Sequence, residues 1–274
     1  MIEHFHKPKT AREALRLKKK YKETTVFLAG GTFVNSIDFP LRPGHIIALG
    51  GLKLGQISQH AGNVTIGALC TLQQMIEDKE VPRFLKAAAS QVVSRNIRNM
   101  ATIGGHIANN RTQSDLIPML IALDAKVELL DCDRAETIPL ADYIETMKEG
   151  LITKIIIPKI HIKRVAACYN FRSSANARSI LTAAVSVTLD RVILRDPIIA
   201  LGGVARHAVR LTSVEEKLNG KPLPETDGLQ EIVRQCVEST FHLTPGGGSG
   251  FKEYQAGVVV ALAAKNACRQ KGGV

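Results

Sequence analysis

The chain has 274 residues, of which 45% are hydrophobic and 22% are charged. This balance is close to that of average globular proteins and excludes a largely disordered chain. The length allows one large domain or two ordinary ones with a sizeable core. Aromatic residues make up only 4% and tryptophan is absent, which argues against a carbohydrate cleft or a surface that stacks nucleotide bases.

No segment approaches the roughly 20 apolar residues that a membrane-spanning helix needs. The first residues, Met1–Pro8, lack the apolar core of a signal peptide. We therefore expect a soluble, cytoplasmic protein with no membrane span. The five cysteines stand far apart and form no CxxC pair, so the usual spacing of a zinc site or an iron–sulfur cluster is missing. We expect these cysteines to be small buried residues and expect no metal ligands on this chain.

The net charge of +11 leaves several explanations open. Neutralisation of phosphates by basic residues drives nucleic-acid binding, so a nucleic-acid binder is one candidate. The basic residues are spread, however, and their densest cluster, Arg16–Lys20, ends a short amphipathic helix, where cations suit the helix dipole. Attraction to a dinucleotide cofactor or to acidic partner subunits would use the same charge. Because no basic stripe with interleaved aromatics is present, we predict no nucleic-acid partner.

The N-terminal residues predict a small β-α-β unit. Thr10 can cap the first helix, and the first strand ends at the pair Gly30-Gly31, so the next helix must follow it by a turn of glycines. The expected elements are a helix over 10–20, a strand over 26–29, a short helix from Thr32 and a strand over 45–49.

The middle of the chain opens with a hairpin over 57–68, in which Gly62-Asn63 supplies the positive φ angles of the turn. The apolar pattern then predicts helices from Thr71, over 84–93 and over 116–123, and strands over 126–130 and 152–157.

The pattern changes beyond about Lys163. Strands are expected over 165–171, 183–189 and 198–201, and helices over 214–218, 229–237 and 254–268. Strands followed by helices indicate a separate α+β domain. We therefore predict two domains, 1–163 (with lobes of about 1–53 and 54–163) and 164–274.

Two glycine-rich segments stand out as candidate binding motifs, Phe27–Thr32 and Ala101–Asn110. In each, paired glycines would let the backbone approach a phosphate without a Cβ in the way, and the following amides would point at the anion. The two segments could converge on one pyrophosphate. The sequence contains no GxGxxG after a strand, no GxxxxGK[ST], no HExxH and no GxSxG, which excludes the standard dinucleotide, P-loop, zinc-protease and hydrolase motifs.

The motifs resemble a known family when they are taken together. AGGT (Ala29–Thr32), TIGGHIAN (Thr102–Asn109), SDLIPMLIALDA (Ser114–Ala125) and the segment Gly203–Leu211, with an apolar helix after Tyr254, are similar to the FAD-binding medium subunit of the molybdenum hydroxylases. That family includes xanthine dehydrogenase and carbon monoxide dehydrogenase. Within it, the likeness is greatest to the bacterial selenium-dependent xanthine dehydrogenase or selenate reductase type.

This resemblance implies an α+β fold with two parts. A two-lobed FAD-binding domain of the PCMH (vanillyl-alcohol-oxidase-like) type would be followed by an antiparallel-sheet-plus-helices domain of the CO dehydrogenase flavoprotein C-terminal type. It also implies an electron-transfer subunit that holds FAD, with the molybdenum cofactor on a large partner subunit and two [2Fe–2S] clusters on a small one. Electrons would pass from the clusters through FAD to NAD⁺ or another acceptor, with no catalytic acid or base on this chain.

The resemblance also assigns candidate FAD-binding residues. Asp115 would contact the FAD, Ile152 would pack near the isoalloxazine ring, and Arg172 would place a positive charge near the flavin that favours its anionic reduced form. From the residues alone, Asp115 could instead cap a helix, Ile152 could be core and Arg172 could be a surface salt-bridge partner. The residues around the phosphates would be Phe27, Leu28, Ala29, Gly30, Gly31, Thr32, Phe33 and Val34 from the first segment and Thr102, Ile103, Gly104, Gly105, His106 and Asn109 from the second.

Three departures from the family pattern leave an alternative open. The family usually has asparagine where this chain has His106, small residues with proline around Asn110–Thr112, and proline where this chain has Ala208. These differences motivate a second interpretation, an interaction subunit with the family fold and weak or lost flavin binding.

Overall fold

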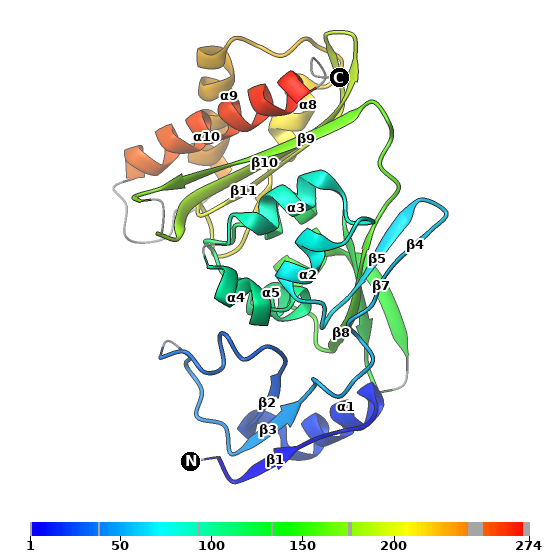
Figure 1. The fold of residues 1–274 in the computed structure, drawn as a ribbon. Coiled ribbons are helices and arrows are strands. Elements are labelled where there is room, and N and C mark those ends of the chain that lie inside the picture. The colour runs from blue at the N-terminus through cyan, green and yellow to red at the C-terminus, as the bar shows by residue number, and fades with distance from the viewer. Residues whose placement is uncertain are drawn as a thin grey trace. The chain divides into compact units, whose positions relative to one another are not determined.

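The computed structural model describes residues 2–37, 39–92, 94–132, 134–174, 177–240 and 249–270. The chain forms two compact units, whose helices and strands are labelled in Figure 1. Both units are discontinuous in sequence, so the single division at residue 163 stays a prediction. The first unit contains residues 1–81, 94–109 and 126–156, and the second contains 82–93, 110–125 and 157–274.

The first unit begins with a three-stranded parallel sheet. Its strands are β1 (His4–His6), β2 (Thr25–Leu28) and β3 (His45–Ala48), in the order β1-β3-β2. Helix α1 (Ala11–Tyr21) begins after Thr10, whose hydroxyl accepts a hydrogen bond from the Glu13 amide, as predicted for an N-cap. A single 3₁₀ turn, η1 (Lys22–Thr24), leads from α1 into β2. The helix and the two longer strands are confirmed, whereas β1 was not predicted.

The segment between β2 and β3 differs from the prediction. Residues 32–37 form turns instead of a helix: the Asn35 amide donates to the Gly31 carbonyl (3.0 Å) and the Ser36 amide to the Phe33 carbonyl (2.9 Å). The segment is short and combines β-branched side chains with Asn and Ser, which compete with helix formation by bonding to nearby backbone. The parallel pairing of β2 with β3 is therefore reached through turns.

A five-stranded sheet makes up the rest of the first unit. Its order is β4-β5-β8-β6-β7, and the pairs β4–β5, β6–β7 and β6–β8 are antiparallel. Four helices complete the unit; α2 was predicted from Thr71, whereas α4, α5, α7 and the strand β7 were not. The bounds are β4 (Ile57–His60), β5 (Asn63–Gly67), α2 (Leu72–Glu77), α4 (Arg95–Met100), α5 (Ile103–Asn109), β6 (Lys126–Leu130), β7 (Ala135–Pro139), α7 (Leu140–Thr146) and β8 (Leu151–Ile157).

The turn of the β4–β5 hairpin is built from other residues than expected. Ala61 (φ +50°) and Gly62 (φ +84°) occupy its two central positions, while Asn63 already begins β5. The prediction that Asn63 supplies a positive φ is therefore wrong. Two consecutive positive φ values are the pattern of a type I′ turn, whose first central position favours Asn, Asp or Gly. Alanine at this position holds a strained backbone because its Cβ disfavours the left-handed region.

We expect Ala61→Asn to raise the free energy of unfolding by about 0.5–1 kcal/mol, since asparagine tolerates the left-handed conformation better than alanine. Ala61→Val at the same position should lower it, because a β-branched residue is a genuine outlier there. Urea denaturation of the two variants and the wild type measures both changes. Equal stability of the Asn and Val variants would contradict the turn assignment.

The second unit is an antiparallel sheet covered by helices. Its strand order is β12-β11-β10-β9, and every pair in it is antiparallel. Helix α3 lies on one face of this sheet and α10, with α9 beside it, on the other (Figure 1), and α6 packs against β10 and β11. The three longer strands and three helices predicted beyond Lys163 are confirmed. The bounds are α3 (Arg83–Ser90), α6 (Ile117–Ala122), β9 (Arg164–Arg172), β10 (Ser179–Asp190), β11 (Ile193–Gly202), β12 (Val209–Arg210), α8 (Thr212–Leu218), α9 (Thr226–Thr240) and α10 (Ser249–Arg269).

No helix in the described ranges is long and apolar enough to cross a membrane. All five cysteines are free thiols. Cys70 and Cys236 are buried as expected, whereas Cys132, Cys168 and Cys268 are partly exposed. Burial raises the pKa of the Cys70 thiol to about 12 and that of Cys168 to about 11, which keeps both as unreactive thiols at neutral pH.

Candidate functional site

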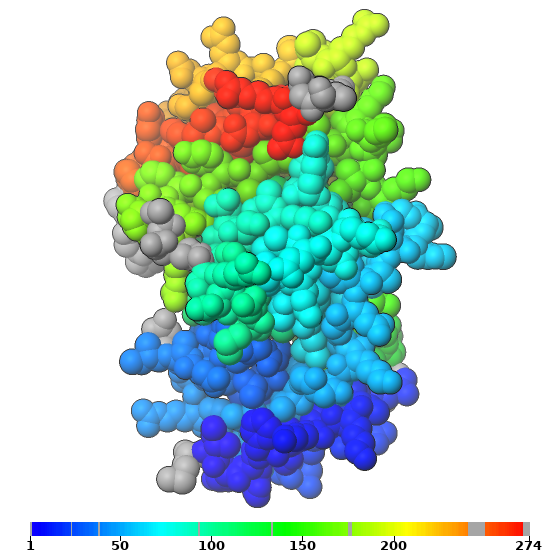
Figure 2. Space-filling model, viewed as in Figure 1, coloured from blue at the N-terminus to red at the C-terminus, as the bar shows by residue number. Residues whose placement is uncertain are grey.

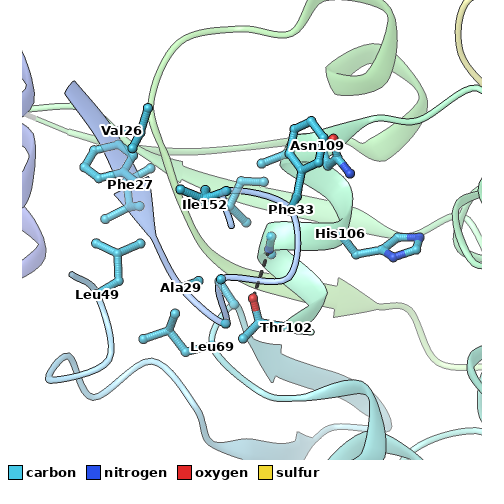
Figure 3. A pocket seen from close by; sticks show the side chains of 18 of the residues that line it. Val26, Phe27, Ala29, Phe33, Leu49, Leu69, Thr102, His106, Asn109 and Ile152 are labelled. Carbon is cyan, nitrogen blue, oxygen red and sulfur yellow. Dashed lines mark hydrogen bonds between the residues drawn. The ribbon is translucent and has the colours of Figure 1, made fainter. Parts of the chain in front are cut away.

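The first unit contains a cavity of about 380 Å³ where the two predicted glycine segments meet (Figure 3). Figure 2 shows the outer surface of the chain in the orientation of Figure 1. A volume of this size lies within the range of small-molecule sites. The structure thus brings together segments that are far apart in the sequence, as predicted. The predicted residues that line the cavity are Phe27, Ala29, Gly30, Gly31, Thr32, Phe33, Val34, Thr102, Gly104, Gly105, His106, Asn109 and Ile152.

The first glycine segment leaves β2 in a turn with unused backbone donors. Gly31 has φ +72°, a conformation that glycine adopts without steric cost. Among the described residues, no hydrogen bond uses the amides of Gly30, Gly31 or Thr32 as donors. Successive free N–H groups at a turn form a concave anion-binding arrangement. This segment therefore has the donors that a phosphate group needs.

The second glycine segment is a helix, α5, and its amides are already engaged. The Ile103 amide donates to the Cys70 carbonyl (3.0 Å), Gly104 to the Ala68 carbonyl (2.9 Å), and Gly105 to the Thr102 hydroxyl (3.2 Å). The expectation of a second turn with amides open to the anion is therefore wrong. The Thr102 hydroxyl accepts from Gly105 (dashed in Figure 3) and keeps its own hydrogen to donate, so its predicted role toward a pyrophosphate stays a prediction.

The glycines of the two pairs have different reasons to be glycine. A Cβ on Gly30 would lie 1.7 Å from the Met100 carbonyl oxygen, and one on Gly104 would lie 2.6 Å from the Ala68 Cβ and 2.8 Å from its carbonyl oxygen. A Cβ on Gly105 would meet only the Thr102 hydroxyl at 2.9 Å and the Ala29 Cβ at 4.0 Å. The first glycine of each pair therefore lets two chain segments cross. At the second glycine of each pair, a Cβ would meet only side-chain atoms and no backbone of another segment.

We expect Gly30→Ala to lower the free energy of unfolding of the cofactor-free protein by about 2 kcal/mol or more, because a backbone carbonyl cannot move aside cheaply. The matched change Gly105→Ala should alter it by less than about 1 kcal/mol, since a hydroxyl can rotate away. Urea denaturation in the absence of ligand measures both. If both variants keep wild-type stability, the crossing at Gly30 is not the constraint described.

Apolar side chains surround the remainder of the cavity. In Figure 3 Phe27 and Leu49 lie at the left, Ile152 near the centre and Phe33 to the right beside Asn109. These side chains form an apolar lining against which a flat aromatic ring system can pack. In the same view the His106 imidazole extends from α5 away from this group. Of the residues predicted in the two glycine segments, Leu28 and Ile103 do not line the cavity, and Ile103 is fully buried.

Thr25 and Lys18, which lie outside the predicted set, also line the cavity. The hydroxyl of Thr25 is buried and has no hydrogen-bond partner among the described residues, and a buried polar atom of this kind points to a missing ligand or water. Lys18 donates to the carbonyls of Thr25 and Lys22, and burial lowers its pKa although Glu149 opposes that shift. Thr25 belongs to no motif of the sequence, whereas Lys18 lies in the basic cluster Arg16–Lys20, and attraction to a dinucleotide cofactor is one explanation for the positive charge of the chain.

Asp115 and Arg172 lie in the second unit, in a hydrogen-bond cluster of their own. Oδ1 of Asp115 accepts from Arg172 Nη2 (3.1 Å), from Asn170 Nδ2 (2.8 Å) and from the Ser179 hydroxyl. Asp115 does not cap α6, whose N-cap residue is Leu116; the Ser114 hydroxyl accepts from the amides of Leu116 and Ile117. The cluster partners Asn170 and Ser179 come from β9 and β10 and were not predicted. A contact of Asp115 or Arg172 with FAD stays a prediction.

We expect Arg172→Ala to lower the free energy of unfolding by about 3 kcal/mol, because it leaves the nearly buried Asp115 carboxylate without its cation. The matched control is Arg234→Ala in the same unit, where an exposed arginine pairs with Glu231 and Glu238. That change should cost less than about 1 kcal/mol. Urea denaturation followed by far-UV circular dichroism compares the two, and similar losses would refute a structural role for the Asp115–Arg172 pair.

Comparison with known proteins identifies both parts of the chain. Residues 1–160 match the family model described as the FAD binding domain in molybdopterin dehydrogenase, and residues 167–267 match the CO dehydrogenase flavoprotein C-terminal domain. The uncharacterized protein YgfM of Escherichia coli (strain K12) is 34% identical over 261 residues, 95% of each chain. The nicotinate dehydrogenase FAD-subunit of Eubacterium barkeri is 28% identical over 237 residues, 80% of each chain.

Solved structures share the fold. The structure of carbon monoxide dehydrogenase from Hydrogenophaga pseudoflava contains a chain that superposes with a TM-score of 0.91 at 23% identity, over 98% of both chains. A chain of quinoline 2-oxidoreductase from Pseudomonas putida 86 gives a TM-score of 0.87 at 16% identity, again over 98% of both. The predicted two-part α+β fold is confirmed.

Proposed function

We propose that this chain, which belongs to the family of FAD-binding subunits of the molybdopterin dehydrogenases, holds FAD in the cavity of its first unit and transfers electrons through it. The pyrophosphate would lie against the turn Gly30–Thr32. The ring systems would pack against the apolar lining.

The free amides of Gly30, Gly31 and Thr32 are the observation that carries this proposal. A pyrophosphate brings negative charge, and its hydrogen bonds to N–H donors are charge-assisted and stronger than neutral ones. Donors left unpaired by the protein are costly unless a ligand or water takes them. A turn with three such amides beside a cavity therefore fits a dinucleotide phosphate.

Other groups around the cavity fit the same ligand. The Thr102 hydroxyl has a hydrogen left to donate, and the buried Thr25 hydroxyl lacks a partner among the described residues. Phe33 and Ile152 offer apolar surface that would exclude water from one side of a flavin ring. These residues bind and orient, and no acid or base among them is required.

When bound, FAD supplies an electron carrier, and the protein sets its position and electrostatic surroundings. We propose that the electrons come from [2Fe–2S] clusters on a small partner subunit, which receives them from a molybdenum-binding large subunit. NAD⁺ or another acceptor would then take them from the flavin. The names of two relatives support a role inside a complex, the FAD-subunit of nicotinate dehydrogenase and the FAD-binding subunit of xanthine dehydrogenase from Escherichia coli O157:H7.

The test is FAD reconstitution of the purified chain, followed by desalting and an absorption spectrum. We expect the wild type to retain the visible bands of oxidised flavin. Thr32→Pro removes one amide donor, which for a hydrogen bond to a charged group corresponds to about 10-fold to 100-fold weaker FAD binding. Fluorescence titration of FAD measures the dissociation constant.

Thr32→Ala is the matched control, since it removes the hydroxyl and keeps the amide. It should bind FAD within about threefold of the wild type, because an exposed neutral hydrogen bond contributes little net free energy. Equal binding by the Pro and Ala variants would refute the amide site. A wild type that stays colourless even with its partner subunits would instead support the interaction subunit without flavin.

A further inference from the structure

Two histidines and a glutamate gather where β1 meets β3, at residues that do not line the cavity. Parallel pairing places His4 directly beside His45, with their rings stacked at 4.9 Å between centroids. The Glu3 amide donates to the Gly44 carbonyl (2.8 Å), which holds Glu3 next to the same strand. One possible ligand atom from each of Glu3, His4 and His45 lies within 4.8 Å of the other two.

The His45 ring is held in place by its neighbours. It is only 9% exposed, and its Nδ1 lies 3.1 Å from Nε2 of His6. The Tyr21 ring stacks on it at 3.9 Å between centroids and 16° between planes. When Nδ1–H of His45 donates to Nε2 of His6, the hydrogen bond sets the orientation of the ring and leaves the lone pair of Nε2 for an ion.

The other two groups are reachable from solvent. Glu3 and His4 are exposed, so an ion can enter without a rearrangement of the core. The buried imidazole therefore faces an accessible carboxylate and a second imidazole.

We propose that Glu3, His4 and His45 form a binding site for one divalent transition-metal ion, with Zn²⁺ as the representative. Two imidazoles and one carboxylate leave one position for water, an arrangement that tetrahedral Zn²⁺ accepts. Imidazole ligands suit Zn²⁺, Ni²⁺ or Cu²⁺, whereas Mg²⁺ and Ca²⁺ prefer oxygen-only sites. His6 would act as the outer partner that orients His45.

The bound ion would stabilise the pairing of the edge strand β1 with β3. β1 is a three-residue edge strand that pairs only with β3 among the described strands. Ligands from both strands would link them through the metal. The binding energy would add to folding because the unfolded chain has no preformed site.

The test titrates Zn²⁺ into the full chain, prepared without a polyhistidine tag, by isothermal titration calorimetry. The wild type should bind one equivalent, and His4→Gln should bind at least about 10-fold more weakly because it removes a ligand. Since His4 is exposed, this change should leave the fold intact. His60→Gln, at an exposed histidine on β4 in the same unit, is the matched control and should bind as the wild type does.

Thermal unfolding gives a second readout that does not depend on flavin. Saturating Zn²⁺ should raise the midpoint by about 3 °C or more in the wild type and in His60→Gln, and by much less in His4→Gln and Glu3→Gln. Mg²⁺ at the same concentration should produce no shift. Equal Zn²⁺ affinity in His4→Gln and the wild type, or no binding by the wild type, would overturn the site.

Discussion

The crossing of two chain segments at Gly30 is the constraint on which the cavity depends. With a hypothetical Cβ only 1.7 Å from the Met100 carbonyl oxygen, any other residue would force the turn after β2 away from the segment that leads into α5. Gly104 approaches Ala68 in the same close way. The two contacts together set how closely the glycine segments approach, and the cavity is the space left beside them. Glycine is therefore required here for packing before any ligand is considered.

The two segments then divide the binding task unequally. In α5 the amides of Ile103 to His106 are engaged by the protein itself, which fixes the helix and the Thr102 hydroxyl in place. In the turn after β2, the amides of Gly30 to Thr32 remain open among the described residues. One segment thus acts as a rigid support and the other supplies donors. A site of this kind gains affinity because the donors are already oriented when the ligand arrives.

Much of the fold could be predicted from the sequence, because the periodicity of a long apolar segment distinguishes a helix from a strand. The strand at 152–157 and the long final helix are examples, and each is confirmed. The prediction failed where contacts between distant segments override the local conformational preference of the sequence. Paired glycines at 104–105 indicated a turn, but contacts with Ala68 and Cys70 hold that segment in a helix. β1 has only three residues and exists because β3 lies beside it. Two features could not be predicted because they involve residues that are distant in the chain. These are the buried Thr25 hydroxyl, which lacks a hydrogen-bond partner among the described residues, and the cluster of Glu3, His4 and His45.

Arg172 shows how a contact alters an assignment made from sequence. A cation near a flavin stabilises negative charge on the reduced ring only to the extent that its own charge is unpaired. In the second unit the guanidinium is 3.1 Å from the Asp115 carboxylate and also donates to the Ser179 hydroxyl and the Gln91 carbonyl. The pair carries little net charge, so a redox effect would require the salt bridge to open or the flavin to bond to the remaining N–H groups. The same salt bridge neutralises a nearly buried carboxylate. In the structure it therefore holds β9, β10 and the start of α6 together.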